Sequence, residues 1–164
     1  MGDAPPEQRF TELYRASHGR VLRFVARRVD DDAEAEDLTA EVFRIAWDKT
    51  TGGDVLTPAW LFVTARHVLS NHHRSVRRGD SAYRKAAVTG PRADERTADL
   101  VAEVLERLPE AHRDVLVHRY WDDLTAGEIA ALTGLSASAV WVRLHRARQA
   151  FKRSYGAEVR HAQR

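Results

Sequence analysis

Two short helical patterns meet at Thr133-Gly134-Leu135-Ser136, and this junction constrains the fold more than any other part of the sequence. Thr125 can cap the first helix while Glu128 reaches back to the freed backbone N–H, as in a capping box. Gly134 stands where a helix normally ends, because glycine adopts the left-handed conformation at little cost. Ser136 can then cap the second helix. The pattern therefore predicts a helix-turn-helix motif.

The second helix of the motif combines an apolar stripe with a basic face. Val140, Leu144, Ala147 and Phe151 recur at three- and four-residue spacing, which predicts a buried stripe. No Asp or Glu occurs between residues 137 and 153. A solvated surface is the alternative interpretation, but a face of one sign suits the DNA phosphate backbone, and arginine can also bond to guanine. The outward-facing residues are Ser138, Trp141, Val142, Arg143, His145, Arg146, Arg148 and Lys152.

The distribution of charge says more about partners than its total. The 164 residues include 26 basic and 24 acidic side chains, so the net charge is only +2. Acidic residues crowd the segment 30–41, whereas arginines and lysine gather over 74–85 and again in the last helix. This segregation predicts one acidic docking face and two basic faces.

Several classes of protein are excluded by what the sequence lacks. The chain has no cysteine, which excludes disulfides, thiolate zinc sites and cysteine redox sensing. No apolar run approaches the roughly 20 residues that span a bilayer. The N-terminus lacks the basic and apolar regions of a signal peptide. We therefore expect a cytoplasmic protein without membrane insertion.

Helical periodicity elsewhere predicts an all-α fold of two small domains joined by a flexible linker, with the helix-turn-helix in the C-terminal domain. A first amphipathic stretch covers about 10–25, although His18-Gly19 could interrupt it. A second helix follows, and Thr57 can cap a third that Pro58 opens. From about residue 75 to 96 no continuous apolar face remains, and this segment is predicted to be the linker.

Three sequence blocks carry a family resemblance over most of the chain. They are Ala35-Glu36-Asp37-Leu38-Thr39 with Glu41-Val42-Phe43 and Ala46-Trp47; Ala59-Trp60-Leu61-Phe62 with Ala65-Arg66; and Leu108-Pro109-Glu110 followed by Arg143-Leu144-His145-Arg146-Ala147-Arg148. In this order and spacing they resemble the sigma-70 family of bacterial RNA polymerase initiation factors, in its two-domain extracytoplasmic-function group. The resemblance implies a region 2-like domain over 7–74, a linker over 75–96 and a region 4-like domain over 97–155.

The resemblance implies that the acidic helix docks on core RNA polymerase. Asp37, Glu41 and Arg44 are the residues expected to contact a basic coiled coil of the largest subunit. Ala40 stands where the family usually has glutamine, so one polar contact is expected to be missing. A solvated acidic helix is the alternative interpretation of the same charges.

The helix that follows Pro58 resembles the element that captures the melted −10 strand of a promoter. Its candidate contacts are Arg66, His67, Asn71 and Arg74, because holding an unstacked base requires aromatic or amide groups together with cations for the backbone. His67 stands where the family often has asparagine. Trp60 is expected to be a core residue rather than a wedge between bases.

The resemblance assigns the −35 element to the second helix of the motif. The candidate contacts are Ser138, Trp141, Arg143, His145, Arg146 and Arg148. The family commonly has a cation where this chain has Trp141 and a serine where it has Val142. These two substitutions could favour contact with a thymine methyl group, or they could mark a surface that meets another protein.

Two other classes of function are alternatives to a sigma factor. An enzyme could be argued from His67, His72 and His73, but the adjacent pair points about 100° apart on a helix and cannot converge on one metal. The sequence also has no H-E-x-x-H arrangement near them and no glycine-rich phosphate loop, and no cofactor is expected. A stand-alone helix-turn-helix regulator would share the C-terminal motif but would need a ligand pocket or a dimerisation helix in the first domain. The partners expected are core RNA polymerase, promoter DNA and an anti-sigma factor, which often inhibits members of this group.

Overall fold

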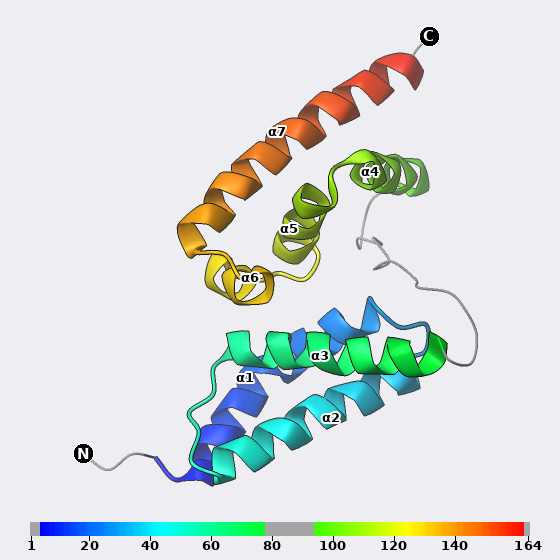
Figure 1. Cartoon of the computed structure of the whole chain (residues 1–164). Coiled ribbons are helices and arrows are strands. Elements are labelled where there is room, and N and C mark those ends of the chain that lie inside the picture. Colours follow the sequence, from blue (N-terminus) through cyan, green and yellow to red (C-terminus); the bar gives the residue numbers. More distant parts are fainter. Residues whose placement is uncertain (1–3, 78–93, 163–164) are drawn as a thin grey trace. The chain divides into compact units, whose positions relative to one another are not determined.

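The computed structural model describes residues 4–77 and 94–162, and every regular element in these two ranges is an α-helix (Figure 1). The chain divides into two compact units, Met1–Ala87 and Val88–Arg164. The predicted all-α fold is confirmed. Among the described helices none is both long and apolar enough to cross a membrane.

The first unit is a bundle of three helices. They are α1 (Pro6–Ala26), α2 (Asp32–Thr51) and α3 (Pro58–Arg77), and each packs against the other two. The Asp31 carboxylate caps α2 by accepting from the Glu34 backbone N–H at 3.3 Å. The core centres on fully buried aromatic rings, of which Phe24 and Phe62 lie 5.4 Å apart between centroids.

Two predicted boundaries in this part of the chain differ from the structure. Helix α1 continues through His18-Gly19 without a break. Helix α3 continues to Arg77, and α4 (Glu95–Arg107) includes the last residues of the predicted linker. The rest of that linker, 78–93, lies outside the described residues. The Thr57 hydroxyl caps α3 as expected by accepting from the Trp60 backbone N–H at 3.3 Å.

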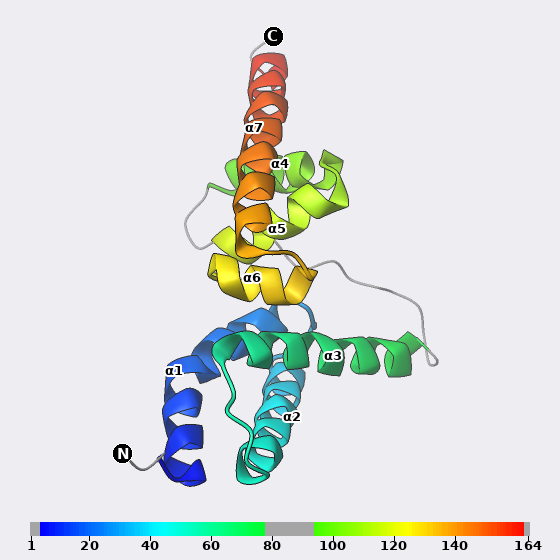
Figure 2. The ribbon, with the colours of Figure 1, turned by 60° about the vertical axis from the view of Figure 1, so that its left-hand side comes forward.

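The second unit contains four helices around a separate core. After α4 come α5 (Glu110–Tyr120), α6 (Ala126–Thr133) and α7 (Ala137–Ala162). Helix α7 packs against all three of the others, and Figure 2 shows it extending well beyond α6. Its buried residues are Val140, Leu144 and Ala147, the first three members of the predicted stripe. The fourth, Phe151, is only half-buried and stacks on Tyr155.

The local geometry of the helix-turn-helix follows the capping signals of the sequence. The Glu128 backbone N–H donates to the Thr125 hydroxyl at 3.2 Å, and the Thr125 N–H donates to the Glu128 carboxylate at 2.8 Å. Gly134 ends α6 in the left-handed conformation, with φ 69° and ψ 16°. The Ser136 hydroxyl accepts from the Ala139 N–H at 3.1 Å at the start of α7. These contacts define the start of α6, the end of α6 at Gly134 and the start of α7.

Candidate nucleic-acid interface and docking surface

The exposed face of α7 collects most of the predicted −35 contacts. Ser138, Trp141 and His145 are exposed and recur at three- and four-residue spacing, so they share one side of the helix, and the exposed Arg146 follows beside that side. Arg143 is half-buried and flanks this face. The outward set is therefore one continuous polar and basic surface that also contains an aromatic ring.

Arg148 is placed differently from the other predicted DNA contacts. It is half-buried at the edge of the packed stripe, and its Nε–H donates to the Tyr120 hydroxyl of α5 at 2.7 Å. Its guanidinium also lies 5.8 Å from the centroid of the Tyr120 ring. Arg148 therefore joins α7 to α5. Tyr120 holds the Arg148 side chain in place, a role that sequence patterns did not identify.

The far end of α7 is tied to α4. The Glu158 carboxylate accepts a hydrogen bond from Arg107. Glu158 is the first acidic residue of α7, so the helix carries only basic charges from its start up to this contact with α4. The long helix is thus anchored at both ends within its own unit.

Helix α3 presents the four predicted −10 contacts to solvent. Arg66, His67, Asn71 and Arg74 are at least partly exposed. His67, Asn71 and Arg74 follow i, i+4, i+7 spacing and share one face, whereas Arg66 lies beside it. Arg74 Nη2 donates to Asn71 Oδ1 at 2.8 Å, which orients the amide. Trp60 is half-buried at the start of the helix, in keeping with an edge-of-core position.

The two adjacent histidines of α3 face a different side of the helix. His72 Nε2 lies 2.8 Å from Glu34 Oε1 of α2, which fastens the second half of α3 to the start of α2. Burial lowers the pKa of His73, and the nearby His72 and Arg77 act in the same direction. Within the described ranges no three His, Asp or Glu side chains are grouped as a metal site.

The predicted docking residues form a stripe along α2. Asp37, Glu41 and Arg44 follow i, i+4, i+7 spacing. Arg44 donates from Nε and Nη2 to the two Glu41 oxygens, both at 2.8 Å, and from Nη1 to Asp48 at 3.0 Å. The hydrogen bond from Arg44 lowers the pKa of Glu41. Arg44 thus partly compensates the negative charges of Glu41 and Asp48. Asp37, at the N-terminal end of the stripe, lies outside this network.

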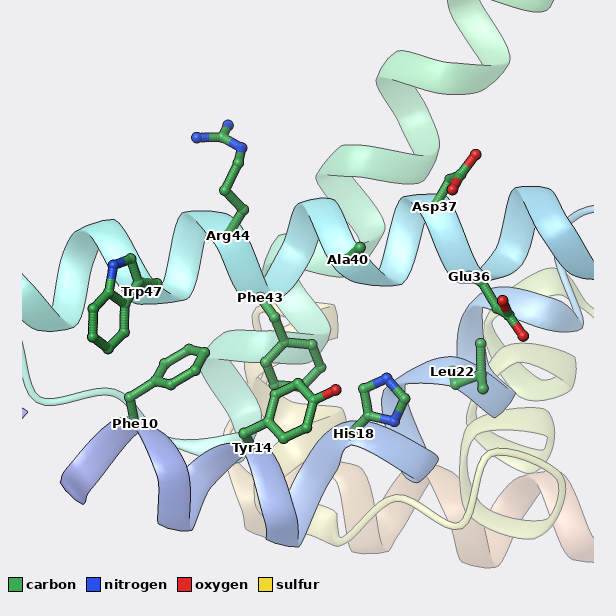
Figure 3. A pocket seen from close by; sticks show the side chains of 10 residues that line it. All are labelled: Phe10, Tyr14, His18, Leu22, Glu36, Asp37, Ala40, Phe43, Arg44 and Trp47. Atoms are coloured by element: carbon green, nitrogen blue, oxygen red, sulfur yellow. The ribbon is translucent and has the colours of Figure 1, made fainter. Parts of the chain in front are cut away.

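An aromatic groove of about 610 Å³ runs between α1 and α2 beside this stripe. Figure 3 shows Phe10, Tyr14 and His18 of α1 facing Phe43 and Trp47 of α2. The rings interlock, with Phe10 and Trp47 5.1 Å apart and Tyr14 and Phe43 4.8 Å apart between centroids. Tyr14 and Trp47 remain more than a third exposed. Sequence patterns did not identify this groove.

The groove and the acidic stripe form one composite surface. Asp37 and Arg44 project from α2 away from α1, whereas Glu36 lies at the end of the groove (Figure 3). Ala40 lines the groove between them and is exposed, so its small side chain leaves the aromatic wall open. An apolar floor beside carboxylates suits a partner helix that carries both apolar and basic residues.

Comparison with protein-family models gives two matches along the chain. Residues 13–79 match the family described as Sigma-70 region 2, and residues 98–151 match Sigma-70, region 4. The first match covers most of the three-helix unit, and the second covers α4 to the middle of α7.

Curated relatives match nearly the whole length of the chain. The ECF RNA polymerase sigma factor SigL of Mycobacterium tuberculosis is 30% identical over 162 residues, which are 92% of this chain and 92% of SigL. The RNA polymerase sigma factor YlaC of Bacillus subtilis is 28% identical over 159 residues, covering 87% of this chain and 90% of YlaC.

Solved structures share the fold at lower sequence identity. CnrH, solved in complex with the cytosolic domain of CnrY, matches with a TM-score of 0.59 and 23% identity, covering 92% of this chain and 90% of CnrH. The sigma factor RpoE of Bartonella quintana, solved with the anti-sigma factor NepR, matches with a TM-score of 0.56 and 19% identity. The latter match covers 88% of this chain and 95% of RpoE.

Proposed function

Because the chain belongs to the sigma-70 family of RNA polymerase sigma factors, in its extracytoplasmic-function group, we propose that it directs promoter-specific initiation by binding core polymerase and both promoter elements. The main support for this function is that region 2 and region 4 are both matched, in that order, and fall on two separate helical units. A factor of this kind positions the polymerase and melts DNA, and it performs no chemistry itself. We expect it to act in the cytoplasm.

The domain over 97–155 binds the −35 element through α7. Arg143 and Arg146 are the main contacts, with Ser138, Trp141 and His145 on the same helix surface. The absence of acidic side chains from residue 137 to 157 supports this role, since each cation placed on a phosphate releases a condensed counterion. Arg148 contributes mainly by positioning, because it is bonded to Tyr120.

The domain over 7–74 holds the melted −10 strand along α3. His67 can stack on or bond to an unstacked base, and the amide of Asn71 can bond to a base edge. Arg66 and Arg74 supply cations for the strand backbone. The solvent accessibility of these side chains on α3 supports this assignment, and the chain between the end of α3 and the start of α4 connects the two domains.

The same domain docks on core polymerase through α2. Asp37, Glu41 and Arg44 lie in one stripe beside the aromatic groove, and a basic coiled coil is the partner whose charge complements them. The groove adds Tyr14 and Trp47 as apolar anchors, which are the residue types that often dominate binding energy at interfaces. Docking therefore combines a charged rim with an apolar centre.

An anti-sigma factor is a further candidate partner. CnrH was solved with the cytosolic domain of CnrY, and RpoE with the anti-sigma factor NepR. Both neighbours share the fold of this chain. We expect an inhibitor of this class to compete with core polymerase for the exposed surfaces of the two units.

The test is transcription in vitro with core RNA polymerase from the source organism on a promoter library. The full chain should give promoter-dependent initiation above that of core enzyme alone, and its absence would exclude the sigma function. A stand-alone regulator would bind DNA but would not associate with core enzyme.

A narrower test concerns one residue of α7. Arg146→Ala should cost about 1–3 kcal/mol of binding free energy at the selected −35 site. Arg160→Ala, which alters an exposed arginine in the last turn of the same helix, is the matched control.

A further inference from the structure

Trp141 and Val142 form an exposed apolar pair on the basic face of α7. Their exposed fractions are 50% and 51%. We infer that this pair selects a thymine by contact with its 5-methyl group in the major groove of the −35 element. The inference rests on the proposed −35 role of α7 and adds the identity of a base to it.

The pair does not belong to the core of the unit. Val140, Leu144 and Ala147 have no exposed surface and define the packed side of the helix. Trp141 and Val142 follow Val140 directly, so their side chains point about 100° and 200° away from it around the helix axis. An indole ring left half in water in this way retains apolar area that a partner can cover.

The charges around the pair favour DNA over a protein as that partner. Arg146 is exposed about one turn after Val142, Lys152 is exposed about three turns after Trp141, and no carboxylate occurs on the helix before Glu158. The pair also lies in the first turns of the second helix of the motif, which is where helix-turn-helix proteins contact base edges. A phosphate-lined groove is therefore the complementary surface for this part of α7.

The chemistry of the two side chains distinguishes thymine from the other pyrimidine. Thymine presents a methyl group and the O4 acceptor in the major groove, whereas cytosine presents the N4 amino donor and no methyl group. Trp141 offers an apolar ring edge and one N–H donor, and it has no acceptor for an amino group. Val142 offers only methyl groups. Thymine therefore matches both features of the pair, and cytosine matches neither.

The experiment removes one methyl group at a time. A duplex is first selected from a library with randomised −35 sequence, using the full chain bound to core polymerase. Each thymine of the selected element is then replaced by deoxyuridine, which lacks only the 5-methyl group. At one position the affinity should fall about fourfold, the factor that corresponds to roughly 0.8 kcal/mol for a buried methyl group.

Three variants assign the methyl contact to the pair. In Trp141→Ala the deoxyuridine penalty at that position should vanish. In Trp141→Phe it should persist, because the ring is kept without the N–H. Val55→Ala, which shortens an aliphatic side chain that is 71% exposed in the other unit, should retain the full penalty. Replacing this thymine by cytosine should lower the affinity, and replacing it by 5-methylcytosine, which keeps the methyl group, should lower the affinity less.

The inference and the proposed function can fail separately. A penalty that is equal in the wild type and in Trp141→Ala, or no penalty at any thymine, would overturn the methyl contact while initiation still proceeds. The absence of promoter-dependent initiation would instead overturn the proposed function. A selected element without thymine would also refute the inference.

Discussion

The Nε–H of Arg148 donates a 2.7 Å hydrogen bond to the hydroxyl of Tyr120, and this contact joins the long helix α7 to α5. Tyr120 is 56% exposed, so the bond lies at the surface. Tyr120→Phe should lower the free energy of unfolding by about 0.5–1 kcal/mol, measured by urea denaturation. The same change should have no further effect in an Arg148→Ala background, and an undiminished effect there would show that the bond is not its cause.

Gly134 and Gly127 predict opposite outcomes for the same substitution. Gly134 has a φ of 69°, and the space that a Cβ would occupy there is open, so Gly134→Ala adds only backbone strain and should destabilise by about 1–2 kcal/mol. Gly127 is helical, and a Cβ there would lie 4.0 Å from the Thr125 hydroxyl. Gly127→Ala should therefore stabilise by about 0.4–1 kcal/mol. Equal signs in thermal or urea unfolding would contradict this assignment.

The Thr125 hydroxyl is one half of the capping box at the start of α6. Thr125→Ala should lower the free energy of unfolding by about 1 kcal/mol, because the Glu128 backbone N–H loses its acceptor. Thr125→Ser keeps that acceptor and should stay close to the wild type. If the alanine and serine variants unfold at the same urea concentration, the cap does not contribute.

The lowered pKa of His73 predicts how the first unit responds to acid. Because burial disfavours its charged form, the unfolded chain binds more protons than the folded chain near the ordinary histidine pKa of about 6.5. The stability contributed by His73 is therefore complete above that value and is lost as the pH falls through the lower folded pKa. His73→Gln should flatten this part of the profile of unfolding free energy against pH. His161→Gln, at an exposed site in the last turn of α7, should leave it unchanged.

Asp37 predicts the salt dependence of docking on core polymerase. It lies at the exposed end of the α2 stripe, beyond the network that Arg44 makes with Glu41 and Asp48. Asp37→Arg should slow association with core enzyme most strongly at low ionic strength, since a rim charge acts mainly on the encounter rate. Asp99→Arg makes the same charge change on an exposed residue of α4 and should have a smaller effect in the same binding kinetics.

The parts of the fold that were predictable depend on residues close together in sequence. The capping box joins Thr125 to Glu128, and the turn needs only the conformation of Gly134. Helix propensity was misleading at Gly19, where a break was considered because a glycine within a helix costs about 1 kcal/mol of stability. Ser17 and Val21 on either side of it are fully buried, so packing of α1 outweighs that cost and the helix continues.

The surfaces that sequence patterns missed join residues far apart in the chain. Phe10 and Trp47 meet only because α1 and α2 pack together, and no periodicity within either helix contains that contact. Tyr120 and Arg148 are likewise brought together by the packing of α5 on α7. The predicted contacts of α3 are all exposed to solvent, which could be predicted because they lie on one helix. Their roles on DNA stay predictions.

The short turn around Gly134 also bears on the entropy of recognition. Its conformation rests on the left-handed backbone of Gly134 and on the Ser136 hydroxyl that caps α7, both local features of the chain. A helix that had to fold on the DNA would lose part of its interaction energy to ordering its own backbone. Here that loss is incurred once, when the chain folds, so the DNA contacts that we propose for α7 can count almost in full toward discrimination between sequences.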